Sequence, residues 1–317
     1  MDIERIHTPV MLARTVELLA PAIEHDRAVL VDATLGMGGH TQALLERFPK
    51  LTVIGLDRDP DALGIARERL APFGDRARFV HTVYDGIVDA VRSEGFSEVQ
   101  GVLFDLGVSS LQLDRAERGF AYSKDAPLDM RMDFTQGRTA EEVIAESSED
   151  ELRRIFFEYG EEKLAARYAR AIVKARAEAP ITRSAELVAV ITAATPVAVQ
   201  RQGHPAKRVF QALRIEVNAE LSVLEDAMPA ALGTLAVGGR IVVLAYQSLE
   251  DRIVKRALQA ASSSSAPAGL PMELPEHRPQ FKLLVRGAEL ASEAEQAENP
   301  RAKPVRLRAA ERVRRPS

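Results

Sequence analysis

The sequence predicts an α/β fold in which an open parallel sheet is interrupted by an inserted all-helical segment. A strand at residues 29–32 leads into a glycine turn at Gly36 and Gly38, and a helix follows directly. Apolar stretches then alternate with helical stretches, which favours parallel pairing of the strands. Apolar segments typical of buried strands lie at residues 53–56, 78–81, 101–104 and 240–245.

Local signals place further elements along the chain. Asp59 is a typical N-cap and Pro60 suits the first helical position, so we expect a helix from there to Leu70. Residues 281–285 and 305–308 alternate in polarity like strands. We expect these two segments to pair antiparallel and to close one edge of the sheet.

The stretch before residues 240–245 is far longer than one crossover helix requires. Its pattern is helical, with a capping box at Ser148 and Glu151. We expect the last helix to return the chain to the sheet, because it carries an apolar stripe. The predicted helices cover residues 161–179, 184–195 and 206–228. The predicted domains are a first core part at 1–112, an inserted helical domain at 113–205, and a second core part with a basic C-terminal tail at 206–317.

The glycine turn indicates which cofactor the sheet could bind. Glycines let the backbone approach a ligand closely, and Asp57, at the end of the second strand, can accept hydrogen bonds from both ribose hydroxyls. The third glycine of the dinucleotide fingerprint is replaced by Thr41, and the chain has no phosphate-binding loop. These features favour S-adenosylmethionine, which carries adenosine without phosphates. The alternative is a tight turn that binds no ligand.

Composition limits the possible classes. The chain has 317 residues, of which 46% are hydrophobic and 28% are charged, as in an ordinary globular protein. No apolar run approaches the roughly 20 residues needed to span a bilayer, and the N-terminus lacks the apolar core of a signal peptide. We therefore expect a cytoplasmic protein with no membrane partner.

The absence of cysteine excludes disulfides, iron–sulfur clusters, thiolate metal sites and thiol nucleophiles. Methylation of a pyrimidine ring carbon through a cysteine adduct is excluded for the same reason, whereas transfer to nitrogen or oxygen needs no adduct. The six histidines form no helical i, i+4 pair, so we expect no metal site.

Charge is informative only locally. A formal net charge of −4 argues against a protein that coats nucleic acid indiscriminately. Basic residues gather at 167–208 and at 301–315, which is compatible either with RNA contact or with ordinary solvated faces. The chain has no tryptophan and few other aromatic residues, so a base-stacking platform is not evident.

Candidate catalytic side chains follow the fourth strand. Asp105, Ser109 and Ser110 offer acceptor groups that could orient the hydrogens of an amine and receive a proton. Serine and aspartate also commonly cap helices and form turns. For the two serines both interpretations remain open.

Several long motifs resemble those of the bacterial small-subunit ribosomal RNA cytosine-N4 methyltransferase family, in the family's order and across nearly the whole chain. Family members often have histidine before the Ser-Leu-Glu-Asp-Arg run, where this chain has Gln247. Tyr84 stands where phenylalanine is usual, and Pro304-Val305 replaces a pair of small residues. The resembling segments are residues 7–10, 32–40, 105–114, 127–133, 208–215, 248–255 and 299–302.

The resemblance implies a class I S-adenosylmethionine-dependent methyltransferase fold, Rossmann-like, whose inserted helical domain recognises the substrate. It further implies methyl transfer to the exocyclic N4 amine of one cytidine in the decoding region of 16S ribosomal RNA in the small ribosomal subunit. The implied cofactor-binding residues are Gly36, Gly38, Gly39, His40, Asp57, Tyr84, Asp105 and Gln112. The implied RNA-binding residues are Arg131, Lys207 and Arg208.

The mechanism we expect is a direct in-line displacement without a covalent enzyme intermediate. Cytosine N4 is conjugated and weakly nucleophilic, so alignment and polarisation of its N–H bonds would be the main contributions of the enzyme. The alternatives are a small-molecule methyltransferase, another nucleic-acid amino methyltransferase, and an RNA-binding assembly protein without activity. A nicotinamide-dependent oxidoreductase is disfavoured by the missing third glycine.

Overall fold

The protein folds into two compact units, seen in a computed structural model that describes residues 9–201, 203–267 and 274–315. The first unit comprises Met1–Gly107 and Leu221–Ser317, and the second comprises Val108–Glu220. An α/β unit interrupted by a helical unit confirms the predicted fold class. The helical unit is wider than the predicted range of 113–205.

A seven-stranded sheet organises the first unit, with the order β3-β2-β1-β4-β5-β7-β6. The first five strands pair in parallel, β7 pairs antiparallel with β5, and β6 pairs antiparallel with β7. The predicted antiparallel pair near the C-terminus is therefore confirmed. The strands are β1 (Val29–Asp32), β2 (Thr52–Asp57), β3 (Ala77–His81), β4 (Val99–Asp105), β5 (Leu235–Ala245), β6 (Phe281–Leu283) and β7 (Arg306–Arg312).

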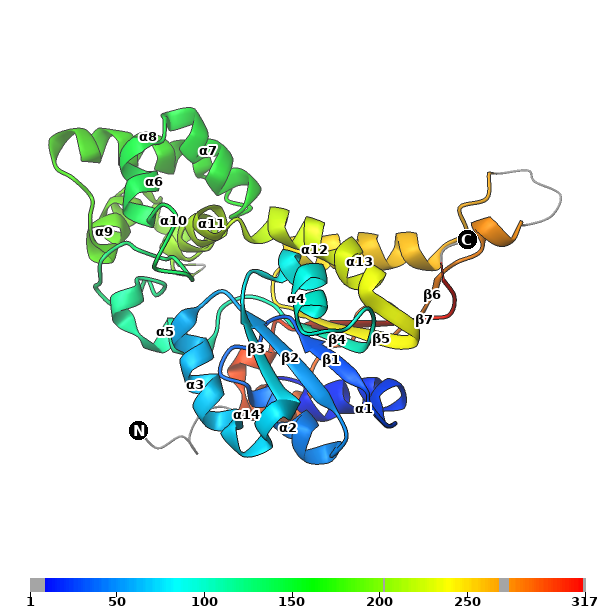
Figure 1. Ribbon diagram of the computed structural model, residues 1–317. Coiled ribbons are helices and arrows are strands. Elements are labelled where there is room, and N and C mark those ends of the chain that lie inside the picture. The colour runs from blue at the N-terminus through cyan, green and yellow to red at the C-terminus, as the bar shows by residue number, and fades with distance from the viewer. Residues whose placement is uncertain (1–8, 202, 268–273, 316–317) are drawn as a thin grey trace. The chain divides into compact units, whose positions relative to one another are not determined.

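Helices cover both faces of this sheet (Figure 1). Side chains alternate along each strand, so Leu30 packs with one set of helices while Val29 and Val31 pack with the other. Burial on both faces explains why the central strands are apolar throughout. The helices of this unit are α1 (Leu12–Ile23), α2 (Gly39–Arg47), α3 (Pro60–Leu70), α4 (Ile87–Ser93), α12 (Glu220–Thr234), α13 (Ser248–Ser262) and α14 (Glu293–Glu298).

The start of α3 confirms the predicted cap. The side chain of Asp59 accepts a hydrogen bond from the backbone N–H of Asp61 at 3.1 Å, and Pro60 occupies the first turn. The helix ends at Leu70, as expected. This helix connects β2 to β3 and so fixes where the end of β2 lies.

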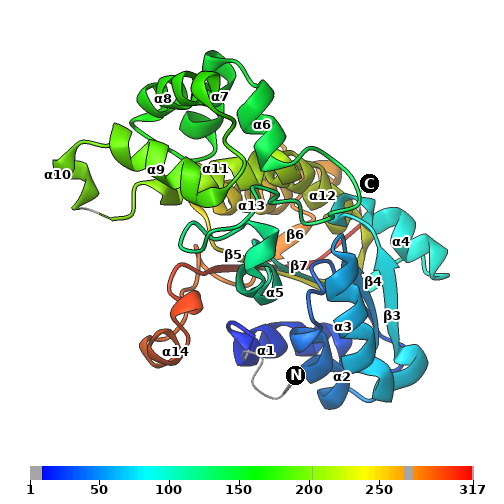
Figure 2. The same ribbon diagram turned by 90° about the vertical axis from the view of Figure 1, so that its left-hand side faces the viewer.

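The second unit is all-helical, and its helices gather around one hydrophobic core (Figure 2). The predicted capping box is present, because Ser148 Oγ accepts from the Glu151 N–H and the Glu151 carboxylate accepts from the Ser148 N–H. The helices are α5 (Ser110–Asp114), α6 (Ala140–Glu146), α7 (Glu149–Glu158), α8 (Ala165–Glu178), α9 (Ser184–Ala194), α10 (Val197–Gln200) and α11 (Ala206–Asn218).

Two helix predictions were wrong in part. The helix expected over residues 161–179 begins only at Ala165. The helix expected over residues 206–228 is divided at Ala219, where a φ of 50° ends α11, and α12 then begins. The stripe of α11 packs in the helical unit, and α12 supplies the helix that covers the sheet. Apolar periodicity shows which side of a helix is buried but not which element buries it.

The sequence predicts no segment that spans a membrane. Within the described ranges, no helix combines the length and the apolar character required to cross a membrane.

Candidate active site

Three acids end neighbouring strands of the sheet: Asp32 on β1, Asp57 on β2 and Asp105 on β4. These strands are parallel and adjacent, so their carboxyl ends meet at one edge. Ligands of open α/β sheets bind at this edge, near the point where the strand order reverses. Here that point lies between β1 and β4.

The glycine turn between β1 and α2 depends on residues without a Cβ. Gly36 has a φ of 53° and Gly38 has a φ of 79°, both in the left-handed region that favours glycine. A Cβ on Gly38 would lie 3.0 Å from Leu70 Cδ1, and one on Gly39 would lie 2.8 Å from Pro9 Cγ. The backbone is therefore packed closely from behind, and the N–H groups at the start of α2 have no partners within the helix.

Asp57 lies directly opposite this turn. Its Oδ2 accepts a hydrogen bond from the Gly36 N–H at 2.7 Å, and its Oδ1 accepts one from the Asp59 N–H at 2.8 Å. Each carboxylate oxygen keeps a further lone pair that could accept from a ribose hydroxyl. Burial raises the pKa of Asp57 to about 6, although the two backbone hydrogen bonds oppose this shift.

Asp32 and two threonines form a structural group that the sequence did not reveal. Asp32 Oδ2 accepts from the Thr41 hydroxyl at 2.7 Å, and burial raises the pKa of Asp32. Thr34 Oγ1 accepts from the backbone N–H of Asp105 at 2.6 Å. Thr41 thus replaces the third fingerprint glycine with a side chain that joins α2 to β1, while Thr34 joins the end of β1 to the end of β4.

Asp105 is held from two sides. Its Oδ1 accepts a hydrogen bond from the Tyr246 hydroxyl at 2.7 Å, and its Oδ2 lies 3.6 Å from His40 Nδ1. The other ring nitrogen of His40 lies 3.1 Å from the carbonyl oxygen of Val10 and must donate to it, because a carbonyl only accepts. Burial raises the pKa of Asp105, and the charge of His40 and the hydrogen bond from Tyr246 oppose that rise.

His40 and Tyr84 differ in how they could serve a ligand. The His40 ring is 6% exposed and is engaged with Val10 and Asp105, so only its backbone is placed for a cofactor at the turn. Tyr84 lies in a short helix after β3, and its ring meets that of Phe104 edge to face with centroids 5.6 Å apart. This contact fixes a half-buried aromatic ring near the end of β3.

Ser109 and Gln112 form a capping box at the start of α5 in the helical unit. Ser109 Oγ accepts from the Gln112 N–H at 3.3 Å, and Gln112 Oε1 accepts from the Ser109 N–H at 3.1 Å. The capping interpretation therefore holds for Ser109. The side chain of Ser110 lies outside the described residues, as do His7 and Thr8 of the first resembling segment.

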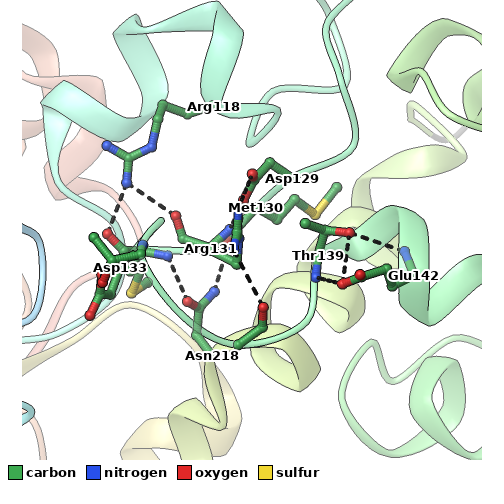
Figure 3. A network of polar contacts seen from close by, with 11 residues as sticks. Arg118, Asp129, Met130, Arg131, Asp133, Thr139, Glu142 and Asn218 are labelled. Carbon is green, nitrogen blue, oxygen red and sulfur yellow. Dashed lines mark hydrogen bonds and ion pairs between the residues drawn. The ribbon is translucent and has the colours of Figure 1, made fainter.

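The resembling segment at residues 127–133 is held by side chains from elsewhere in the helical unit (Figure 3). Asn218 accepts from the Met132 N–H and donates to the Met130 carbonyl, each at 2.8 Å. The Arg118 guanidinium donates to the carbonyls of Arg131 at 3.1 Å and Met132 at 2.8 Å. Met130 has a φ of 60°, a strained conformation that these contacts support.

Arg131, expected to face RNA, forms an ion pair within the same segment. Its guanidinium donates two hydrogen bonds to the Asp129 carboxylate, at 2.8 and 2.9 Å, and its side chain is 21% exposed. Lys207 and Arg208 at the start of α11 are exposed. Arg208 also donates to the Glu161 carbonyl at 2.6 Å.

Much of the basic C-terminal tail serves the fold of the first unit. Arg308 on β7 donates to both oxygens of Asp251 on α13, at 2.7 and 3.1 Å. Arg312 is buried and donates to the Leu235 carbonyl at 2.6 Å. The Ser-Leu-Glu-Asp-Arg run therefore supplies structural contacts: Asp251 binds β7, while Glu250 caps α13 by accepting from the Gln247 N–H.

The sheet order with an antiparallel β7 inserted between β5 and β6, the glycine turn after β1 and the acid that ends β2 define a class I S-adenosylmethionine-dependent methyltransferase. The residues of the described site fit this cofactor, because they include backbone N–H groups, a carboxylate opposite the turn and an aromatic ring. They do not include the third glycine on which pyrophosphate binding depends.

The family follows from comparison with known proteins. The model of the MraW methylase family matches residues 4–313, and the chain belongs to this family. It is 71% identical over 309 residues to ribosomal RNA small subunit methyltransferase H of Leifsonia xyli subsp. xyli, covering 98% of this chain and 95% of the relative. It is 62% identical to the protein of the same name from Saccharopolyspora erythraea, covering 97% of this chain and 94% of the relative.

Proposed function

We propose that this methyltransferase transfers a methyl group to the exocyclic N4 amine of one cytidine in the decoding region of 16S ribosomal RNA. The observation that carries the chemistry is the Asp105 carboxyl at the end of β4, which Tyr246 holds at 2.7 Å and which faces His40. Support for the substrate comes from relatives that carry the name ribosomal RNA small subunit methyltransferase H across nearly the whole chain.

The residues proposed to hold the cofactor begin with those of the glycine turn. The backbone of Gly36, Gly38, Gly39 and His40 would approach the ligand, and Asp57 would accept from the ribose hydroxyls. The Tyr84 ring would flank the adenine. Asp105 would bind the methionine end, and Gln112 is proposed to contribute to the same end.

The chemistry proposed is a direct displacement. S-adenosylmethionine, when bound, supplies an electrophilic methyl group on a sulfonium centre. Asp105 would accept a hydrogen bond from an N–H of the target amine and so orient the lone pair of the amine nitrogen. It would then take up the proton that leaves this nitrogen. Ser109 and Ser110 are proposed to add acceptor oxygens. No covalent adduct is needed, and the chain has no cysteine to form one.

RNA contact is proposed for the helical unit. Lys207 and Arg208 are exposed at the start of α11, where cations can meet phosphates. Arg131 is proposed as a weaker contributor, because Asp129 already neutralises its guanidinium. The target base must leave its stack to reach a buried site, as in other enzymes that act on bases.

The experiment is methyl transfer from labelled S-adenosylmethionine to small ribosomal subunits from a strain lacking this gene, followed by nucleoside mass spectrometry. We expect label in N4-methylcytidine. The Asp105→Asn variant is expected to abolish it, while Asp26→Asn, an exposed acid paired with Lys50, keeps it. Label in another nucleoside would overturn the N4 assignment. No label on subunits or their RNA, with cofactor binding intact, would favour a small-molecule acceptor.

A further inference from the structure

Tyr246 reaches Asp105 from the end of β5, the strand next to β4. It directly follows β5, which pairs with β4 in a register that sets Leu244 opposite Asp105. The ring therefore leaves β5 two residues beyond the partner of Asp105. Its hydroxyl lies 2.7 Å from Asp105 Oδ1, across 141 positions of sequence.

The Tyr246 ring is fixed before it meets Asp105. Its backbone N–H donates to Glu250 Oε2 at 3.0 Å, within the cap of α13. Its ring packs against the hydrophobic core on the α1 side of the sheet. It also lies beside Gly107, where a Cβ would come 3.8 Å from Tyr246 Cδ2. These contacts fix the backbone and the ring of Tyr246, so its side chain loses little conformational freedom when its hydroxyl bonds to Asp105.

The direction of the hydrogen bond is defined by the charges around it. Burial and the neighbouring Asp105 carboxylate raise the pKa of Tyr246, so its hydroxyl keeps its proton and donates. The same donation lowers the pKa of Asp105 against the effect of burial. On the other side, His40 faces Asp105 Oδ2 with the ring nitrogen that does not bind Val10.

We propose that Tyr246 is a positioning residue that orients the Asp105 carboxylate and keeps it ionised toward the cationic methionine end of the cofactor. This inference rests on the proposed role of Asp105 in cofactor binding. The contact on which this role depends is the hydrogen bond from the Tyr246 hydroxyl to Asp105 Oδ1, so Tyr246 acts through Asp105. We therefore expect Tyr246 to contribute to the affinity for the methionine end of the cofactor and not for its adenosine.

Other charged groups around the pair define what the experiment must separate. Asp105 is faced by His40 on α2 and by Asp32 on β1. Tyr246 is faced by Glu250 on α13 and by Glu295 on α14. None of these is altered by Tyr246→Phe, which removes a single oxygen atom and keeps the ring.

Calorimetric titration of the full chain tests the proposal with two ligands. One is S-adenosylmethionine, and the other is 5′-methylthioadenosine, which has the adenosine but no amino acid group. For Tyr246→Phe we expect about tenfold weaker binding of S-adenosylmethionine, since a hydrogen bond to a charged group is lost, and unchanged binding of methylthioadenosine. The loss should grow as the pH falls. Without the hydrogen bond from Tyr246, burial raises the pKa of Asp105 further, so the variant loses the charge of this carboxylate at a higher pH than the native protein.

Control variants separate the possible outcomes. Tyr168→Phe removes a buried hydroxyl that lies 2.8 Å from Thr195 Oγ1 in the helical unit, and it should leave both affinities unchanged. Asp105→Asn should weaken S-adenosylmethionine at least as much as Tyr246→Phe. If Tyr246→Phe does not fold, Tyr246→Met lacks the donor as well and gives the same readout.

Three results would overturn the inference, each in a different way. Weak binding by Asp105→Asn together with full affinity in Tyr246→Phe would remove the positioning role of Tyr246 and leave the role of Asp105 intact. Full affinity in Asp105→Asn would remove the proposed role of Asp105 itself. An equal loss for both ligands in Tyr246→Phe would indicate a general structural effect.

Discussion

The Asp57 carboxylate accepts a hydrogen bond from the backbone N–H of Gly36 at 2.7 Å, so the acid that ends β2 is bonded directly to the turn that follows β1. The two parts of the predicted cofactor site are therefore coupled before any ligand arrives. The position of the carboxylate depends on the turn, and the turn depends on the carboxylate. Changes at either residue should alter both.

We expect cofactor binding to depend on the ionisation of Asp57. Burial raises its pKa to about 6, so the carboxyl is ionised above that pH and neutral below it. A neutral carboxyl loses charge-assisted acceptor capacity, so the affinity for S-adenosylmethionine should fall as the pH drops through about 6. At pH 8 the Asp57→Asn variant should bind S-adenosylmethionine at least about tenfold more weakly than the native protein. Calorimetry between pH 5 and pH 8 measures both effects.

Asp26→Asn is the control for that titration, because Asp26 is an exposed acid that pairs with Lys50. Its affinity should follow the native curve. A native affinity that stays constant from pH 5 to pH 7 would contradict the assignment of this carboxyl to the ribose.

A methyl group on the glycine turn should destabilise the protein. Gly38→Ala forces a Cβ into a left-handed conformation and to 3.0 Å from Leu70 Cδ1, at a cost of about 1–3 kcal/mol. Gly64→Ala is the matched control, because its added Cβ meets no atom within 4 Å and lies on α3. In a helix this control should be neutral or more stable by up to about 1 kcal/mol. Urea unfolding monitored by circular dichroism gives both values, and equal stability of the two variants would contradict the packing argument.

Removal of the Asn218 amide should loosen the segment at residues 127–133. Asn218→Ala loses hydrogen bonds to Met130, Met132 and Arg214 and leaves buried groups unpaired, so we expect a loss of about 2–4 kcal/mol. Amide exchange at Met132 should accelerate, since its N–H loses its acceptor. Gln42→Ala, an exposed contact with Glu46, should change stability by less than about 0.5 kcal/mol. Native exchange at Met132 in Asn218→Ala would be the contrary result.

RNA affinity should respond unequally to the three predicted cations. Lys207→Gln and Arg208→Gln should each weaken binding to small-subunit RNA and reduce the slope of log affinity against log salt by about one. Arg131→Gln should have a smaller effect, because Asp129 neutralises its guanidinium at 2.8 Å. Filter binding across a salt series provides the slopes.

The control for this series is Arg153→Gln, whose guanidinium pairs with Asp150 on α7. It should leave the slope unchanged. A loss at Arg153 equal to that at Lys207 would indicate general attraction, and no specific contact at the start of α11.

Several elements were predictable because their causes are local. The cap of α3 at Asp59, the capping box at Ser148 and the buried strands all depend on residues within a few positions of one another. The candidate acids Asp57 and Asp105 were found because each ends an apolar strand. Local chemistry also explains why Ser109 stayed open between catalysis and capping, since serine suits both, and the structure shows that its side chain caps α5.

Other features depend on contacts between distant positions. No periodicity in the sequence indicates that Tyr246 bonds Asp105, that Thr41 bonds Asp32, or that Asp251 binds Arg308. From composition, the basic residues of the tail were expected to contact RNA or to lie on solvated faces. Arg312 is instead buried and donates to backbone carbonyls.

The sequence by itself determined the α/β class, the glycine turn, the acid at the end of β2 and the family resemblance, because these depend on residue types at fixed short spacings. The tertiary structure decided that α11 belongs to the helical unit, that Ala219 separates it from α12, and that Tyr246 and His40 hold Asp105 from two sides. The physical reason is that strand register and packing select partners across more than a hundred residues, and short-range patterns carry no information about that choice.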